Sequence, residues 1–267
     1  MAVDLNGARI LLTGASGGIG NAIARALHKR GASLAITGRR ADALESLKTE
    51  LGSRVDVLLA DLCKREDVEG LPTRAGSVDV LVANAGLPGS GELTGFSPEQ
   101  IDRAIDVNLR APMQLTRALL PGMLERGSGH LVFVSSLSGK VPSAGSTVYS
   151  ATKFGLRGFG DSLHDELHGT GVGATTVFPG FISDAGMFAD SGVKLPTGVG
   201  TKPPEKVADA VIEGIEKGRA EIDVAPLAVR ATGKLAGLAP GAVTAVNRRF
   251  GGRDVSDGLA AAQRDKR

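Results

Sequence analysis

The feature that most constrains this sequence is a glycine-rich turn between an apolar run and a helical pattern near the start of the chain. The apolar run is RILLT (9–13), the turn is TGASGGIG (13–20), and apolar residues then recur at helical spacing as far as Gly31. Such a turn brings the backbone close to a pyrophosphate, and the N–H groups of the helix N-terminus favour an anion. A glycine motif between a strand and a helix is much stronger evidence than a lone one. The pattern therefore predicts a dinucleotide site that contains Gly14, Ser16, Gly18, Ile19 and Gly20.

Two other interpretations of the same turn are weaker. Residues 14–18 also fit G-x-S-x-G, the nucleophile elbow of serine hydrolases. That chemistry needs a later histidine as general base, and His28, His130, His164 and His168 all precede the last third of the chain. No Gly-Lys-Ser/Thr follows the glycines, which argues against an NTPase phosphate loop.

The rest of the chain continues the alternation of apolar runs and helical patterns. Because the runs are apolar nearly throughout, they are typical of parallel strands covered on both faces. We predict a doubly wound (Rossmann) α/β fold of about seven strands, with residues 1–225 as the catalytic domain, a lid at about 184–202, and 226–267 as a C-terminal extension of the same domain. The further expected strands are 33–37, 55–60, 78–86, 130–136, 172–180 and 220–225, and the further expected helices are 41–52, 97–126 with breaks, 149–168 and 203–218.

Charge and composition exclude several classes of protein. The net charge is +2 with scattered basic groups, which gives no support to nucleic-acid binding. No apolar stretch reaches the ~18 residues of a membrane span. Cys63 is the single cysteine, so no internal disulfide can form, which fits a reducing cytosol. His164 and His168 are spaced for a metal, but DEL between them is typical of an exposed helix end. We expect a cytoplasmic protein with no metal site.

The end of the second expected strand points to the coenzyme. An NAD site usually has an acidic residue there to bind the ribose 2′-hydroxyl. This chain reads TGRR, so Arg39 and Arg40 stand where the acid would be. Guanidinium groups attract and hydrogen-bond a 2′-phosphate. The pattern favours NADP(H) over NAD(H).

Later motifs make a family resemblance plain. They are ADL at 60–62, NAG at 84–86, Asn108 in VNL, VSS ending at Ser136, YSATK at 149–153 and PG at 179–180. With the glycine turn, they make the chain resemble the single-domain short-chain dehydrogenases/reductases from residue 9 to about 183. The last forty or so residues match no motif of that family.

The only tyrosine of the chain, Tyr149, has Lys153 four residues later on the same expected helix face. A free phenol has a pKa near 10, too high for efficient proton exchange at neutral pH. We expect the ammonium of Lys153 to lower the pKa of Tyr149, which would then act as general acid in reduction and as general base in oxidation. Ser136 would hold the substrate oxygen, whereas Ser135 would point the other way on an extended strand.

The resemblance assigns the remaining roles. It implies that Asn108 holds a water linked to Lys153, and that Lys153 also binds the nicotinamide ribose. Two departures from the family pattern concern the coenzyme. Ser183 and Asp184 stand where threonine is frequent, and Gly17 replaces a basic residue of many NADP-using relatives. The coenzyme contacts implied by the resemblance are Asp61 and Leu62 at the adenine, Asn84, Ala85 and Gly86 at its ribose, and Pro179, Gly180 and Ile182 at the nicotinamide.

The resemblance and the lid sequence together define the expected activity. Met187, Phe188 and Leu195 give residues 184–202 an apolar character. We expect a hydride-transferring oxidoreductase for a hydrophobic carbonyl or secondary alcohol, assembled as a homodimer or homotetramer. The alternatives are a dinucleotide-binding regulator without turnover and an epimerase or dehydratase, although the latter usually needs a larger C-terminal domain.

Overall fold

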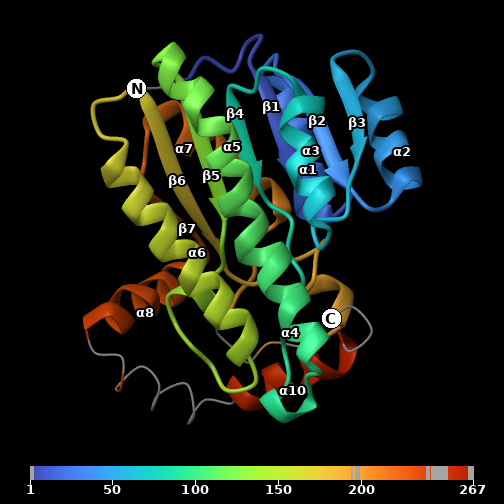
Figure 1. The fold of residues 1–267 in the computed structure, drawn as a ribbon. Helices are drawn as coiled ribbons and strands as arrows, with labels where there is room; N and C mark the ends of the chain where they lie inside the picture. The colour runs from blue at the N-terminus through green and yellow to red at the C-terminus, as the bar shows by residue number, and fades with distance from the viewer. Residues whose placement is uncertain (1–2, 194, 196–198, 239–240, 242–251, 264–267) are drawn as a thin grey trace.

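A single parallel sheet with helices on both faces forms the body of the protein (Figure 1). The computed structural model describes residues 3–193, 195, 199–238, 241 and 252–263. The sheet has seven strands in the order β3-β2-β1-β4-β5-β6-β7, and every pairing is parallel. This confirms the predicted doubly wound fold. The strands are β1 (Arg9–Thr13), β2 (Ser33–Gly38), β3 (Val55–Leu59), β4 (Val80–Ala83), β5 (Gly129–Val134), β6 (Val172–Pro179) and β7 (Glu221–Val224).

Two layers of helices cover the sheet. One face carries α1 (Gly18–Lys29), α2 (Ala41–Leu51) and α7 (Pro204–Lys217), and the other carries α3 (Arg65–Ala75), α5 (Ala111–Arg126) and α6 (Thr147–Glu166). Side chains of β1 alternate between the layers: Ile10 and Leu12 join the first core, and Leu11 joins the second. Because both faces are buried, the strands need apolar residues at consecutive positions, as the sequence shows.

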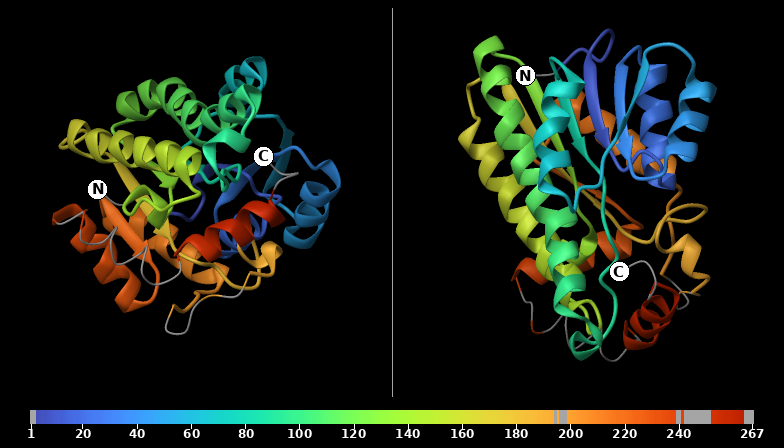
Figure 2. Two further views of the ribbon diagram at one scale, coloured as in Figure 1. Left: turned by 90° about the horizontal axis from the view of Figure 1, so that it is seen from below. Right: turned by 45° about the vertical axis from the view of Figure 1, so that its right-hand side comes forward.

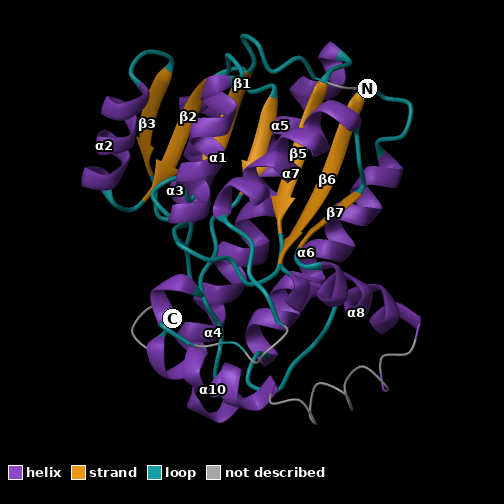
Figure 3. Ribbon diagram, turned by 180° about the vertical axis from the view of Figure 1, so that it is seen from behind, coloured by secondary structure: helices purple, strands orange, loops and turns teal. Residues whose placement is uncertain are grey.

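All strands end at the same edge of the sheet, and the irregular parts of the chain gather there. Figures 1 and 3 show α4 (Pro98–Ile105), α8 (Leu227–Leu238) and α10 (Gly252–Ala262) beyond this carboxyl-terminal edge. The chain order of the strands reverses between β1 and β4, which is where open α/β sheets bind ligands.

The segment from α4 to α5 is a nearly continuous helix with an irregular centre. Ser97 caps α4 and forms a capping box with Gln100, and Pro98 is at the first turn, as the sequence predicted. A π-helical segment, η2 (Asp106–Arg110), joins α4 to α5. Such bulges occur mainly at functional sites, and this one carries Asn108.

Sequence patterns missed three helices. The first, α3, contains Pro72 and has a weak apolar pattern, whereas α8 and α10 lie in the segment without recognised motifs. In the part of the chain that the structure describes, every helix is too short or too polar to cross a bilayer.

Two of the glycines of α6 serve packing within the chain. A Cβ on Gly160 would lie 2.2 Å from Thr176 Oγ1, and one on Gly155 would lie 3.0 Å from Leu109 Cδ2. Gly155 and Gly160 therefore let α6 approach η2 and β6, whereas Gly158 is exposed with open space around it. Phe159 packs inward, edge-on to Phe133 with ring centroids 5.3 Å apart.

Candidate active site

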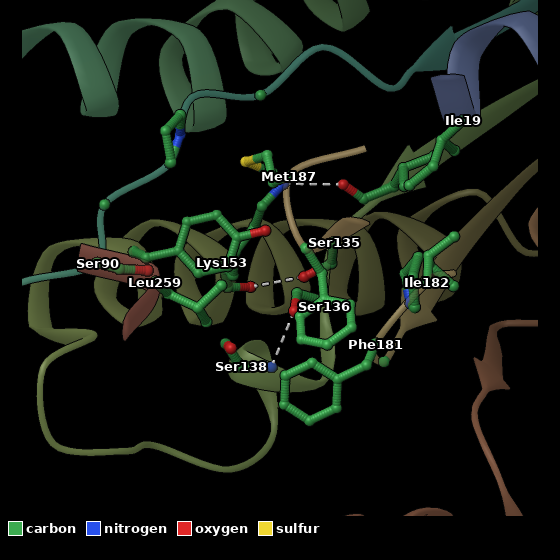
Figure 4. A pocket seen from close by; sticks show the side chains of 18 of the residues that line it. Ile19, Ser90, Ser135, Ser136, Ser138, Lys153, Phe181, Ile182, Met187 and Leu259 are labelled. Atoms are coloured by element: carbon green, nitrogen blue, oxygen red, sulfur yellow. Dashed lines mark hydrogen bonds between the residues drawn. The ribbon is translucent and has the colours of Figure 1, made fainter. Parts of the chain in front are cut away.

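A cavity of about 160 Å³ lies at the carboxyl ends of β4, β5 and β6. Residues just beyond each strand line it, and α6 contributes Tyr149 and Lys153. Figure 4 shows Ser136 and Lys153 beside Phe181, Met187 and Leu259. Of the residues predicted from the sequence, this cavity brings together Ile19, Asn84, Gly86, Ser136, Tyr149, Lys153, Pro179, Gly180 and Ile182.

Tyr149 lies in the first turn of α6 and is held by close packing. A Cβ on Gly89 would lie 2.9 Å from Tyr149 N, so only glycine lets the 84–91 segment pass this close to α6. Burial raises the pKa of the Tyr149 phenol to about 12, and a hydrogen bond with Ser136 opposes the rise. The phenol is therefore protonated at neutral pH.

Lys153 is buried one helical turn later, with a relative exposure of 2%. Its Nζ donates a 2.9 Å hydrogen bond to Val134 O and lies 5.6 Å from the Tyr149 ring centroid. Burial lowers the pKa of the Lys153 amine to about 8. The expected lowering of the Tyr149 pKa by Lys153 is not what this structure shows, because desolvation of the phenol dominates and the amine bonds to a main-chain oxygen instead.

The two adjacent serines after β5 have different partners. Ser135 Oγ donates to Lys153 O at 3.0 Å, which fixes α6 to the strand. Ser136 Oγ accepts a 3.1 Å bond from Ser138 N (Figure 4), and the Ser136 side chain also hydrogen-bonds Tyr149. The 3₁₀ turn η3 (Leu137–Gly139) that follows packs against α6, since a Cβ on Gly139 would lie 2.7 Å from Lys153 O.

Asn108 lies behind the cavity wall and is fully buried. Its Oδ1 accepts from Leu87 N at 2.7 Å, and its Nδ2 donates to Leu87 O at 3.0 Å and to Thr152 Oγ1 at 3.2 Å. The amide thereby joins the segment after β4 to α6. Gly86 lies between Asn108 and Lys153: a Cβ there would be 3.5 Å from Asn108 Oδ1 and 3.7 Å from Lys153 Nζ.

A second cavity, of about 520 Å³, lies next to the first at the ends of β1, β2 and β3. Arg40 Nη2 donates to Ser16 O, so its guanidinium lies against the glycine turn. The turn is linked to the first cavity through Asn84, whose Nδ2 donates to Thr13 O at 3.0 Å. Of the predicted residues, Gly14, Ser16, Arg39, Arg40, Asp61, Leu62, Ala85 and Gly86 line this second cavity.

The glycine turn has the shape that a dinucleotide requires. Gly14 has φ +69°, and a Cβ there would lie 2.7 Å from Ala85 Cα. A Cβ on Gly20 would lie 2.2 Å from Gly14 O, so this glycine lets α1 start directly against the turn. The first N–H groups of α1 have no carbonyl partner within the helix. The two cavities, the open helix N-terminus and the two arginines together fit a phosphorylated dinucleotide.

The start of the loop 184–202 covers the glycine turn. A Cβ on Gly18 would lie 2.2 Å from Ala185 Cβ, and one on Gly186 would lie 3.6 Å from Ile19 Cδ1. The base of the loop is closed by Ser183 N donating to Lys202 O at 3.0 Å. Asp184, with φ +64°, accepts a 2.7 Å bond from Ser183 Oγ.

In the described part of the chain, His, Cys, Asp and Glu side chains form no group of three or more that could hold a metal ion. His164 Nδ1 instead lies 2.8 Å from Ala174 O. The first cavity offers the amine of Lys153 and several hydroxyls, among them those of Ser136 and Tyr149, beside apolar side chains.

Comparison with known proteins identifies the family. The sequence model described as "short chain dehydrogenase" matches residues 8–194. This protein belongs to the short-chain dehydrogenase family. The family is one of oxidoreductases, and the match covers every residue predicted for the site.

Individual relatives of the short-chain dehydrogenase family agree with this. Ketoacyl reductase HetN of Nostoc sp. (strain PCC 7120) is 38% identical over 82% of this chain and 79% of that protein. NADP-dependent 3-hydroxy acid dehydrogenase YdfG of Escherichia coli (strain K12) is 37% identical over 76% of this chain and 86% of that protein. The closed form of serine dehydrogenase complexed with NADP⁺ superimposes with a TM-score of 0.74 at 33% identity, covering 82% of this chain and 95% of that one.

Some residues of the site were not found from the sequence. The first cavity is also lined by Ser90, Ser138 and Ser146, and by Leu259 and Gln263 from the end of the chain. Leu259 and Gln263 lie outside the part that the short-chain dehydrogenase model matches. Their four-residue spacing places them on one helix face, but nothing in the sequence says what that face covers.

Proposed function

We propose that this protein is an NADP(H)-dependent oxidoreductase that interconverts a carbonyl and a secondary alcohol, with Tyr149 as general acid and base. The observation that carries the proposal is that Ser136, Tyr149 and the buried Lys153 line one cavity next to the glycine turn. When bound, the nicotinamide supplies or accepts the hydride.

The coenzyme proposal rests on the second cavity. Arg39 and Arg40 line it together with the glycine turn, and the acids Asp61 and Asp190 line it as well. Asp61 Oδ1 already accepts from Cys63 N at 3.1 Å. Two guanidinium groups favour a 2′-phosphate over a hydroxyl. The names of relatives that use NADP⁺ support the same choice.

In the reductive direction, the substrate oxygen lies between the hydroxyls of Ser136 and Tyr149. Ser136 stabilises the negative charge that develops on this oxygen. Tyr149 Oη gives its proton to the oxygen as the carbonyl carbon is reduced, which leaves a phenolate. With a raised pKa the phenol is fully protonated at neutral pH but is a weak acid, so its proton transfer depends on stabilisation of the phenolate that is left.

Lys153 supports the phenolate that forms. With a pKa of about 8 the amine is mainly charged at neutral pH, and a cation one turn away stabilises the phenolate after proton transfer. One of its three protons is used by Val134 O. The other two are free to bind the coenzyme ribose or a water, and Gly86 leaves the room for this. Asn108 is proposed to hold Leu87, and with it this side of the cavity, in position.

The cavity wall favours a substrate with an apolar part. Ile182, Met187 and Phe188 line it, and the rings of Phe181 and Phe188 lie 4.9 Å apart. HetN is named as a ketoacyl reductase and YdfG as a 3-hydroxy acid dehydrogenase. We therefore propose 3-oxoacyl compounds and simple hydrophobic ketones as the first substrates to test.

The Tyr149→Phe variant tests this function. We expect it to bind NADPH as tightly as the wild type but to lose about 100-fold or more in kcat/KM for any carbonyl that the wild type reduces, because it lacks the acid. Binding is measured by NADPH fluorescence and turnover by nicotinamide absorbance. Ser150→Ala is the matched control, since the next residue of α6 has a buried hydroxyl without a hydrogen-bond partner.

A near-wild-type rate in Tyr149→Phe would contradict the assigned role. A wild type that binds NADPH tightly yet reduces no carbonyl and oxidises no alcohol of a broad set would favour the alternative, a dinucleotide-binding regulator.

We propose a homodimer or homotetramer in solution. Exposed apolar side chains on α4, α5 and α6 support it, and they are Ile105, Met113, Leu124 and Phe154. Sedimentation velocity of the wild type measures the assembly directly.

A further inference from the structure

The helix α10 lies across the opening of the first cavity. Figure 2 (left), seen from the carboxyl-terminal edge of the sheet, shows this red helix crossing in front of the strand ends. Leu259 and Gln263 line the cavity together with Ser136 and Tyr149. The helix also packs on the 3₁₀ turn η4 (Ala189–Ser191) of the loop 184–202. The end of the chain and this loop thus meet over the cavity.

Gln263 connects the end of the chain to the loop 184–202. Its side chain has a relative exposure of 4%, and its Nε2 donates to Met187 O at 3.1 Å. Because a main-chain carbonyl only accepts, this contact decides which end of the amide faces Met187. The Gln263 backbone N–H donates to Leu259 O at 3.0 Å, so Gln263 is also held to the helix that carries Leu259.

The oxygen of the Gln263 side-chain amide lacks a hydrogen-bond donor. Gln263 Oε1 is buried and has no hydrogen-bond partner, and among the described residues it is the one such atom that belongs to a residue lining this cavity. A buried acceptor without a donor costs at least as much stability as one neutral hydrogen bond contributes. The Gln263 amide therefore contributes little net stability here, and its hydrogen bond acts to position Met187 relative to the helix that carries Leu259.

We propose that α10 is the specificity-determining wall of the substrate site. Leu259 limits the length of the apolar part of the substrate, and Gln263 is a positioning residue that holds this wall to Met187. The proposal rests on the proposed function, because it assumes that the first cavity receives the substrate. It concerns residues outside the part of the chain that the family model matches.

The first experiment measures a length profile. Wild type and Leu259→Ala are assayed with NADPH on methyl ketones and 3-oxoacyl thioesters of increasing chain length. Shortening Leu259 removes apolar wall, so we expect kcat/KM for the longest substrates to rise about tenfold or more relative to the shortest, with NADPH affinity unchanged. The matched control is Leu235→Ala, which shortens a leucine of α8 that is 55% exposed. An unchanged length profile in Leu259→Ala would overturn the proposed wall.

The second experiment tests Gln263 without requiring turnover. A carboxylate in Gln263→Glu cannot donate to Met187 O and repels it, whereas Gln263→Met keeps the shape and removes the unpaired oxygen. Hydrogen exchange of residues 186–193 and 255–263 is followed in each variant. We expect faster exchange in both segments for Gln263→Glu near pH 8, and slower exchange at lower pH where the buried acid regains a proton to donate.

The two proposals can fail separately. Exchange in Gln263→Glu that matches the wild type at both pH values would refute the positioning role even if carbonyl reduction is established. If no carbonyl is reduced but exchange responds as expected, the proposed function fails and the contact between α10 and Met187 stands.

Discussion

At the residue scale, burial decides the chemistry of the site. Spacing alone put Tyr149 and Lys153 on one helix face, and the structure places both there. Spacing could not show that Lys153 is buried and Tyr149 partly buried, nor that desolvation raises the pKa of the phenol to about 12 and lowers that of the amine to about 8. The phenol thus keeps its proton at neutral pH but is a weak acid, so proton donation to a carbonyl would depend on the mainly charged Lys153 amine stabilising the phenolate that forms.

A prediction at the residue scale concerns Arg39 and the preference for NADPH over NADH. We expect Arg39→Asp to shift the ratio of kcat/KM for NADPH over NADH by about 100-fold towards NADH, because a carboxylate repels the 2′-phosphate and can bind the ribose hydroxyl. Steady-state kinetics with both coenzymes measures the ratio. Arg117→Asp makes the same charge change at an exposed position of α5 outside both cavities, and it should leave the ratio as it is. Equal ratios in wild type and Arg39→Asp would count against coenzyme selection by this residue.

At the element scale, close backbone approaches bring the groups of the candidate site together. Gly89 lets the segment after β4 pass Tyr149, Gly139 lets η3 pack on α6, and Gly20 lets α1 start at the glycine turn. The sequence showed the glycine turn as a motif because strand, turn and helix are adjacent in the chain. It gave no sign of Gly89 and Gly139 as contacts, because their partners in α6 are distant in sequence.

Gly18 allows a test of another close backbone approach, that between the glycine turn and the loop 184–202. A Cβ at this position would lie 2.2 Å from Ala185 Cβ, so Gly18→Ala must displace the start of the loop 184–202. Overpacking of this kind costs about 1–3 kcal/mol, and we expect NADPH affinity to fall about tenfold. Fluorescence titration measures it. The adjacent Gly17→Ala is the control, since its Cβ would meet Gly14 O at an ordinary 3.5 Å. If both variants bind NADPH alike, the contact between turn and loop does not matter for coenzyme binding.

At the scale of the whole molecule, contacts between distant segments hold the site in place. Lys140, just after η3, is 8% exposed, donates to Glu221 Oε2 at 2.8 Å and Asp223 Oδ1 at 2.6 Å, and lies 3.9 Å from the centre of the Phe178 ring. It therefore fixes the segment that follows Ser136 to the edge strand β7. The burial of Lys153, which lowers the pKa of its amine, also makes global stability depend on pH.

The effect of Lys153 on the pH dependence of stability can be measured. Its amine pKa falls from 10.5 to about 8 on folding, so between these values the unfolded chain binds more protons and stability rises with pH. Burying the charged Lys153 amine lowers the free energy of unfolding by about 3 kcal/mol. This destabilisation is present in full below pH 8 and is lost as the pH approaches 10.5. Tyr149 acts in the opposite sense only above pH 10. From about pH 8 to 10 we expect wild type to gain stability relative to Lys153→Met in urea unfolding, and parallel curves for the two proteins would contradict a buried, shifted amine.

What the sequence determined by itself is the doubly wound sheet, the glycine turn, the two arginines and the spacing of Ser136, Tyr149 and Lys153. These features rest on local periodicity and on motifs whose residues lie near one another in the chain. Tertiary structure alone decided the burial that sets both pKa values, the main-chain partners of Asn108 and the inward packing of two α6 glycines. It also decided that Leu259 and Gln263 reach the cavity. Those properties depend on which distant segments meet, and solvent exclusion and close packing arise only when they do.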